Sequence, residues 1–168
     1  RTDGTAAGTT LVKDINPGAN PSHPFNLTAG TNRLFFVAND GTLGYELWQS
    51  NGTAAGTTLV RDIYPGDGYS PPEYLTDVDG MLFFSGDDGS GRELWKSDGT
   101  TSGTVPVKDI FSGGGSEPAY LVNVNGTLFF QASDGVHGKE LWRSDGTAAG
   151  TSLVKDNNPA GDSALGEH

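Results

Sequence analysis

Short apolar runs separated by polar turns give the chain the pattern of β-strands. Leu-Phe-Phe opens three of these runs, at Leu34–Val37, Leu82–Phe84 and Leu128–Phe130, and Gly, Asn or Asp lies near the ends of each run. Val-Asp-Gly at 78–80 and Val-Asn-Gly at 124–126 contain dipeptides that favour two-residue hairpin turns. No stretch repeats its apolar residues at helical spacing. The pattern therefore predicts an all-β protein.

The strand pattern recurs along the chain. Glu-Leu-Trp occurs at 46–48, 93–95 and 140–142, so that successive tryptophans are 47 residues apart. A Gly-Thr-rich turn follows each tryptophan, and a hydrophobic stretch then ends in Lys or Arg followed by Asp. Residues 3–15 repeat this second half alone. A fixed period of this length indicates repeated supersecondary units, of which the chain holds about three and a half.

Each unit is predicted to contain four strands, called A to D in chain order. In the second unit they span Glu73–Val78 (A), Met81–Ser85 (B), Arg92–Ser97 (C) and Thr104–Ile110 (D). Four short antiparallel strands, repeated along the chain, are typical of the blades of a β-propeller. The sequence therefore predicts an all-β propeller with three four-stranded antiparallel blades per chain.

Three blades leave the ring open. The predicted boundaries are an extra D-type strand at 1–15, blades at 16–63, 64–110 and 111–157, and a tail at 158–168 that a tag remnant could explain. Propellers have typically about 4 to 8 blades, and an open arc exposes the apolar faces of its end blades. We therefore expect the ring to close by association, most simply as a six-bladed homodimer.

Two segments compete for the outer position of the last blade. They are Thr9–Ile15 at the start of the chain and Thr151–Asp156 near its end. The N-terminal segment of one chain is expected to complete the last blade of the partner. The C-terminal segment is the weaker competitor, because Asn157 stands where the other copies have Ile. An alternative is that the chain is a piece of a longer propeller.

Aromatic residues within the strands are expected to pack between blades, because neighbours cover both faces of a blade. Trp48, Trp95 and Trp142 occupy the same position in strand C of their units. A second interpretation is that these three tryptophans stack on sugar rings.

Loop lengths divide each unit into a fixed and a variable part. The A–B and C–D loops keep their lengths, whereas the B–C and D–A loops change in length and sequence. Alternating strand direction places both variable loops on one rim, here called the B–C/D–A rim, where a rigid scaffold can vary its ligand contacts. The candidate ligand-binding residues on this rim are Asp40, Asp87, Asp88 and Asp134 in the B–C loops, with Tyr64, Tyr69, Tyr74, Phe111 and Tyr120 in or beside the D–A loops.

The acidic candidates have structural alternatives. Asp in an Asp-Gly turn commonly accepts hydrogen bonds from its own loop, whereas several such carboxylates together could bind calcium or a sugar. Glu46, Glu93 and Glu140 recur in phase, which favours a structural role such as pairing with Arg or Lys or accepting backbone donors. We expect no cofactor, with calcium as the one candidate that these acidic residues suggest.

Composition narrows the classes of function. The 168 residues include 21 Asp+Glu against 10 Lys+Arg, and the formal net charge of -11 disfavours nucleic acid and anionic lipid as partners. No apolar run approaches the roughly 18 residues of a membrane helix. The absence of Cys excludes disulfides and thiolate catalysis. We find no Ser-His-Asp spacing, P-loop, dinucleotide-binding motif or EF-hand loop.

One long motif resembles a known repeat. Glu-Leu-Trp-x-Ser-Asp-Gly-Thr-x-x-Gly-Thr-x-Leu-Val-Lys-Asp, at 140–156 and with small changes at 46–62 and 93–109, is similar to the bacterial ELW-x-x-DGT repeat, often labelled hyalin-like. The resemblance implies an extracellular or cell-surface protein and carries no catalytic motif.

Together, these observations predict a non-enzymatic structural, adhesion or ligand-binding module whose variable rim contacts a glycan, calcium or a protein. The alternative is a polysaccharide hydrolase or lyase that uses carboxylates of the rim.

Overall fold

Three four-stranded antiparallel sheets make up the fold. The computed structural model describes residues 1–66, 68–157 and 159, and this part of the chain contains no helix. Sheet 1 consists of β1 (Phe25–Ala29), β2 (Leu34–Asn39), β3 (Tyr45–Ser50) and β4 (Thr58–Arg61). Sheet 2 consists of β5 (Glu73–Val78), β6 (Met81–Asp87), β7 (Arg92–Ser97) and β8 (Val105–Lys108). Sheet 3 consists of β9 (Ala119–Val124), β10 (Thr127–Ser133), β11 (Lys139–Ser144) and β12 (Ser152–Lys155).

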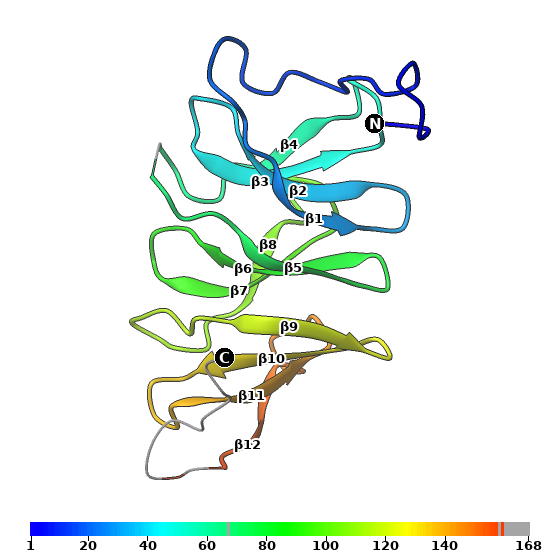
Figure 1. Ribbon diagram of the computed structural model, residues 1–168. Helices are drawn as coiled ribbons and strands as arrows, with labels where there is room; N and C mark the ends of the chain where they lie inside the picture. The colour runs from blue at the N-terminus through cyan, green and yellow to red at the C-terminus, as the bar shows by residue number, and fades with distance from the viewer. Residues whose placement is uncertain (67, 158, 160–168) are drawn as a thin grey trace.

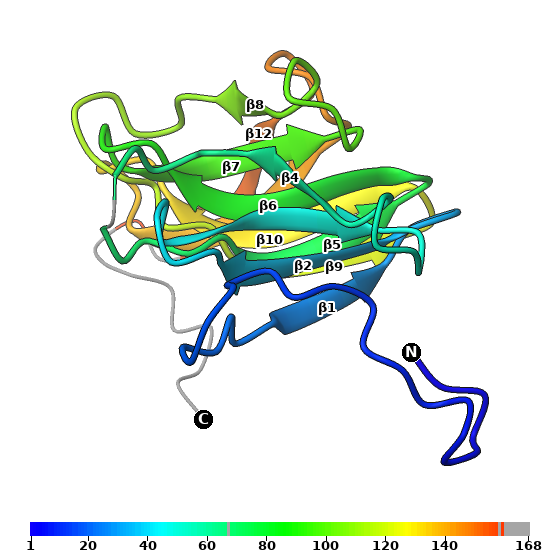
Figure 2. The ribbon, with the colours of Figure 1, turned by 90° about the horizontal axis from the view of Figure 1, so that it is seen from above.

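The sheets stack face to face in chain order, with sheet 2 in the middle (Figure 1). Seen from above, they lie over one another (Figure 2). Within each sheet the strands pair in chain order, and the A strand of sheet 2, β5, contacts both β1 and β9. The prediction of an all-β fold with three four-stranded antiparallel units is confirmed.

Sheet 2 shows how closely the predicted strand ends match. Strands A and C begin and end as predicted, whereas strand B continues to Asp87. Strand D is shorter than predicted because both of its predicted ends bond elsewhere. The hydroxyl of Thr104 bonds Ser97 and the carbonyl of Thr100, and the N–H of Ile110 donates to the carboxylate of Glu93.

The two predicted hairpin turns adopt left-handed backbone conformations. Asp79 and Gly80 have φ angles of 53° and 90°, and Asn125 and Gly126 have φ angles of 51° and 82°. Positive φ at both central residues is the mark of a type I′ turn, whose twist matches that of the adjoining strands. The turns predicted from Asp-Gly and Asn-Gly are therefore confirmed.

Side chains, rather than backbone pairing alone, close each C–D turn. In sheet 2 the Asp98 Oδ1 accepts hydrogen bonds from the N–H of Thr100 (2.8 Å) and from its hydroxyl (2.7 Å). The Thr100 hydroxyl also accepts from the N–H of Gly103 at 2.9 Å. Asn51 and Asp145 begin identical arrangements in the other two sheets. The Gly-Thr-rich motif therefore encodes a self-contained turn.

We expect Thr100→Val to lower the free energy of unfolding by about 1 to 2 kcal/mol, because valine keeps the shape but loses the hydroxyl's hydrogen bonds to Asp98, Gly103 and Ser102. Urea unfolding followed by tryptophan fluorescence measures this change. Thr42→Val is the matched control, since the Thr42 hydroxyl bonds nothing in the described part of the chain, and its effect should stay within about 0.5 kcal/mol. Equal losses in the two variants would contradict the role of the turn.

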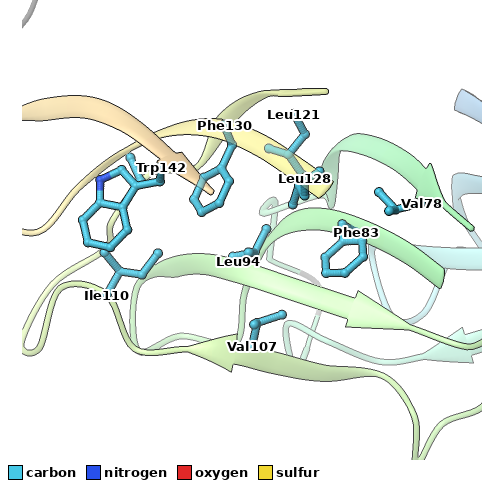
Figure 3. Packing of buried hydrophobic residues seen from close by; sticks show 10 residues of the cluster. Val78, Phe83, Leu94, Val107, Ile110, Leu121, Leu128, Phe130 and Trp142 are labelled. Atoms are coloured by element: carbon cyan, nitrogen blue, oxygen red, sulfur yellow. The ribbon is translucent and has the colours of Figure 1, made fainter. Parts of the chain in front are cut away.

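Two apolar clusters hold the sheets together. Between sheets 1 and 2, Phe84 and Trp95 pack against Phe35 and Leu47, and the Phe84 and Trp95 rings stack at 6.2 Å. Between sheets 2 and 3, a second cluster includes the side chains labelled in Figure 3: Val78, Phe83, Leu94, Val107, Ile110, Leu121, Leu128, Phe130 and Trp142. Core packing of the strand aromatics is thereby confirmed.

Each tryptophan faces the unit that precedes it. Trp95 belongs to the cluster shared with sheet 1, and Trp142 to the cluster shared with sheet 2. Trp48 packs with Phe36 and Ile15 on the outer face of sheet 1. All three indole rings are buried, so the interpretation that they stack on sugar rings is wrong.

A cation at the end of three D segments repeats one contact with the next unit. The Arg61 guanidinium donates to the carbonyl of Thr104 at 2.6 Å and lies 5.5 Å from the centre of the Trp95 ring. Lys108 makes the same contacts with Thr151 and Trp142, and Lys13 makes them with Thr57 and Trp48. Residues 1–15 therefore contact sheet 1 in the same way as the D segment of sheet 1 contacts sheet 2.

The N-terminal segment keeps its turn but forms no strand in the single chain. The loop from Asp3 to Thr9 has the hydrogen bonds of the other C–D turns. No strand is assigned over residues 1–24, because the chain offers Thr9–Ile15 no free strand C to pair with. Its pairing with a second chain stays a prediction. Except for Pro159, the predicted tail at 158–168 lies outside the described residues.

Candidate functional site

The four predicted aspartates each close their own B–C loop. Asp88 Oδ1 accepts hydrogen bonds from the N–H (3.1 Å) and the hydroxyl (2.6 Å) of Ser90. The other three accept backbone N–H groups two to four residues further on, with Asp40 bonding Thr42 and Leu43, Asp87 bonding Gly89 and Gly91, and Asp134 bonding Val136 and His137. The structural alternative for these residues is thus observed.

Hydrogen bonding lowers the pKa of two of these aspartates, Asp88 and Asp134. The Ser90 hydroxyl lowers the pKa of Asp88. Partial burial acts to raise the pKa of Asp134, but the hydrogen bonds from the backbone and imidazole of His137 outweigh burial and lower it. The same contact, 2.7 Å between Asp134 Oδ2 and Nδ1 of His137, raises the pKa of His137. Both aspartates are therefore ionised at neutral pH and engaged within their loops.

The described residues provide no cluster of three His, Asp or Glu side chains that could hold a metal ion. The B–C loop aspartates belong to three different sheets, and each faces its own turn. The suggestion of calcium binding therefore gains no support from these side chains.

Two of the predicted tyrosines form an exposed pair. Tyr74 on β5 and Tyr120 on β9 lie with their ring centres 5.7 Å apart. Their side chains remain 40% and 57% exposed, respectively. The adjacent A strands β5 and β9 bring the two residues together across the gap between sheets 2 and 3. Burial, and to a smaller extent the electrostatic effect of the neighbouring Tyr120, raises the pKa of Tyr74. Its phenol therefore stays protonated at neutral pH.

The backbone at these tyrosines is unusual. Tyr74 and Tyr120 have φ angles of 54° and 55°, and Asn26 has 52° at the same position of sheet 1. All three lie where the register between strands A and B shifts, as in a β-bulge. Asn tolerates the left-handed region, but a bulky aromatic residue there costs on the order of 1 kcal/mol or more. Such strain clusters at functional sites, which draws attention to the tyrosine pair.

A second aromatic row contains residues that the sequence analysis missed. Tyr69 packs edge-on against Tyr45 at 5.5 Å, and Tyr45 packs against Phe25 at 5.6 Å. Tyr69 was a predicted candidate, whereas Tyr45 and Phe25 were not. One signal was present in the repeat, because Arg92 and Lys139 precede Glu-Leu-Trp in the other units where Tyr45 does so in the first.

Asp88 and Phe111 line one pocket of about 330 Å³ on sheet 2, together with Asp109, Trp95 and Pro106. The Asp88 carboxylate is already engaged with Ser90. The structure therefore brings two predicted residues into this pocket.

The remaining predicted residues lie at other places. Asp40 and Asp134 lie at the loops of sheets 1 and 3, and Asp87 bonds the Ser70 hydroxyl at 3.2 Å. The rings of Phe111 and Tyr64 lie close against Gly135 and Gly68, respectively, which gives both rings a packing role.

Buried glutamates connect strand C to the end of strand D. Glu46 accepts hydrogen bonds from the N–H groups of Ile63 (2.8 Å) and Tyr64 (3.1 Å). Burial raises the pKa of Glu46 to about 7, although both hydrogen bonds act to lower it. Burial raises the pKa of Glu93 as well. The alternative that these glutamates accept backbone donors is confirmed for Glu46 and Glu93.

Comparison with known proteins does not assign this chain to a class, so the class is described from the fold alone. Neither the protein-family models nor the curated proteins give a match to this chain. In the described residues there is no helix of a length and apolarity suited to crossing a membrane. The architecture itself is that of an all-β repeat protein built from stacked four-stranded sheets.

Proposed function

We propose that the protein is a non-enzymatic repeat module whose B–C/D–A rim binds a glycan. The Tyr74–Tyr120 pair carries this proposal, because it is exposed, lies at the edge of the rim and is held in a costly backbone conformation. Aromatic rings offer flat apolar surface with a polar tip, which suits the C–H faces and hydroxyls of a sugar ring. An uncharged ligand also suits a chain of net charge -11.

The arrangement of carboxylates supports binding over hydrolysis. A glycosidase needs two carboxyl groups that face the substrate at roughly 5 to 10 Å from one another. The rim aspartates accept hydrogen bonds from their own loops, and Glu46 and Glu93 are buried and bonded to backbone N–H groups. These hydrogen bonds support a scaffold role for the carboxyl groups.

We also propose that the three sheets are half of a six-bladed propeller closed by a second copy of the chain. The outer face of sheet 3 supports this assembly. Val154 is 45% exposed there, whereas its counterparts Val60 and Val107 are 2% and 7% exposed between sheets. The resemblance to the ELW-x-x-DGT repeat supports the further proposal of an extracellular or cell-surface location.

A glycan array followed by calorimetry with the best glycan tests the binding site. Tyr74→Asn and Tyr120→Asn are each expected to weaken binding by about tenfold, through lost stacking. Asparagine suits the test because Asn26 adopts the same backbone conformation in sheet 1.

Val124→Asn is the matched control, because Val124 is exposed at the A–B end of β9, on the rim opposite the proposed site, and should leave affinity unchanged. Full affinity in the doubly substituted protein, no bound glycan at all, or turnover of a polysaccharide would each contradict the proposal.

A further inference from the structure

A buried glutamate anchors the segment that follows strand D in sheets 1 and 2. Glu93 shows the complete arrangement, since it accepts the N–H groups of Ile110 (3.2 Å) and Phe111 (3.3 Å) and both the N–H and hydroxyl of Ser116. Glu46 accepts the N–H groups 17 and 18 residues further on, as Glu93 does. The buried carboxyl groups of sheets 1 and 2 are therefore satisfied by backbone donors.

Glu140 in sheet 3 has the same position but no donor among the described residues. It is fully buried, and neither Oε1 nor Oε2 has a hydrogen-bond partner in that part of the chain. At a separation of 17 residues the chain has Asn157, which is exposed, where sheets 1 and 2 have the buried Ile63 and Ile110. A buried carboxyl group without donors is costly, so Glu140 marks a site that awaits two N–H groups.

The N-terminal segment carries the matching donors. Ile15 and Asn16 stand where the donor pairs of the other units stand, after the same Lys/Arg-Asp dipeptide. Ile15 already packs on the outer face of sheet 1, as Ile63 packs on sheet 2. The backbone N–H groups of Ile15 and Asn16 form no hydrogen bond in the described part of the chain. These two N–H groups therefore lack the hydrogen bonds to a buried glutamate that their counterparts form in sheets 1 and 2.

An exposed leucine points to the same place. Leu11 is 81% exposed. Its counterparts Leu59 and Leu153 pair across strand C with Trp48 and Trp142, respectively. Leu11 therefore has the side chain of a D strand but lacks the tryptophan that such a strand covers.

The two incomplete ends complement each other. Residues 1–15 and β12 lie at opposite ends of the stack (Figure 1), and the first residues project away from the sheets (Figure 2). Phe129 and Leu141 on sheet 3 are only partly buried, whereas their counterparts Phe35 and Leu47 are covered by sheet 2. One chain cannot bring its own two ends together, but a second copy can.

We propose that residues 9–16 of a second copy replace β12 beside β11, so that the N–H groups of Ile15 and Asn16 of that copy bind the Glu140 carboxyl group. This inference rests on the proposed two-chain ring and names the contact that closes it. Leu11 then covers Trp142 in the register now held by Leu153. The contact forms twice in a dimer, once at each junction, which closes the ring without a free end.

We expect residues 9–16 of the second copy to displace β12, because β12 buries fewer side chains and makes fewer contacts than the incoming segment would. Strand β12 is as long as β4 and β8, but its Val154 and Lys155 are exposed, whereas the corresponding residues of β4 and β8 are buried or half-buried. The cation contact supports the same exchange. Lys13 already bonds Thr57 and lies over Trp48, whereas the Lys155 side chain makes no hydrogen bond or ring contact in the described part of the chain.

Paired cysteines distinguish the two strands, since the natural chain contains no Cys. Arg143 now lies opposite Ser152, and the repeat places Thr10 of a second copy there in the proposed assembly. Directly opposed residues of antiparallel strands are close enough for a disulfide. Thr10→Cys combined with Arg143→Cys should therefore give a covalent dimer under oxidising conditions.

Ser152→Cys combined with Arg143→Cys is the matched control. Its disulfide forms within one chain, and its yield should fall as a higher protein concentration produces more dimer, because the second copy then displaces β12 from β11. Light scattering on the natural chain accompanies this test. A monomeric mass overturns both the ring and this contact. A dimeric mass without the Thr10–Arg143 cross-link keeps the ring and overturns the contact.

Glu140→Gln tests the carboxyl group itself. We expect dimer dissociation, measured by sedimentation equilibrium, to become about tenfold easier, because the amide of Gln offers one acceptor oxygen where the carboxyl group offers two for the two N–H groups. Glu93→Gln, within one chain, should leave the dimer constant unchanged. Equal weakening by both variants, or none by Glu140→Gln, overturns the proposed contact.

Discussion

Trp95→Ala is expected to lower the free energy of unfolding by about 3 to 5 kcal/mol, the range for removing a large aromatic side chain from a packed core. Trp95 is 2% exposed and lies between sheets 1 and 2. Its ring stacks on Phe84, and the Arg61 guanidinium lies over it. Alanine would leave a cavity at the junction and would remove both contacts. Urea unfolding, followed by circular dichroism, measures the loss.

Trp95→Phe provides the matched comparison, because phenylalanine keeps an aromatic ring in the cluster and should cost less than alanine. Val136→Ala, at an exposed loop position, should change stability by less than about 0.5 kcal/mol. A loss below about 1 kcal/mol for Trp95→Ala would mean that the junction of sheets 1 and 2 does not depend on this cluster.

Protein stability is expected to fall as the pH rises from about 4.5 to about 7, the range between the ordinary pKa of a glutamate and the raised pKa of Glu46. Over this range the folded protein holds a proton on Glu46 that the unfolded chain has released, so raising the pH favours unfolding. The full shift corresponds to about 3 kcal/mol. Glu93 contributes in the same direction, because burial raises its pKa too.

Glu46→Gln removes the Glu46 share of this pH dependence. We compare the free energy of unfolding of the variant with that of the natural protein at each pH. Between pH 4.5 and pH 8 this difference should change by about 3 kcal/mol in favour of the variant. Urea unfolding at a series of pH values tests the difference, with Thr42→Val as a control that keeps the natural slope. Parallel curves for Glu46→Gln and the natural protein would contradict the assignment.

Aspartates of the C–D turns act in the opposite direction at lower pH. The Thr100 hydroxyl and N–H lower the pKa of Asp98, and those of Thr147 lower the pKa of Asp145. Their contribution is present above the ordinary pKa of Asp and is lost as the pH falls through the lowered values. With the glutamates losing stability above about pH 4.5, the maximum should lie between about pH 4 and 5.

Repetition made most of the fold predictable. The 47-residue spacing of the tryptophans defined the units, and Asp-Gly and Asn-Gly located the A–B turns of sheets 2 and 3. Strands β5 and β7 have their predicted ends because both are bounded by local signals. The ends of strand D were less predictable, since Ile110 leaves the ladder to bond a glutamate 17 residues earlier.

The candidate site was predicted only in part. Tyrosines on the rim could be named because they lie near variable loops, but nothing local shows that Tyr74 and Tyr120 meet. Their left-handed backbone also runs against the preference of aromatic residues, so no propensity could predict it. Tyr45 joins Tyr69 across different units, and such contacts depend on how the sheets stack.

The sequence by itself determined the repeat, the strand class and the turn chemistry, because these depend on hydrogen bonds and apolar alternation between residues close in the chain. Only the tertiary structure decided which carboxyl groups are satisfied and which are left without donors. The Glu-Leu-Trp motif is identical in all three units, yet Glu46 and Glu93 have backbone donors and Glu140 has none among the residues that the structure describes. That difference arises because each glutamate depends on the segment that follows strand D, and the last described unit lacks the buried isoleucine that anchors this segment in the other two.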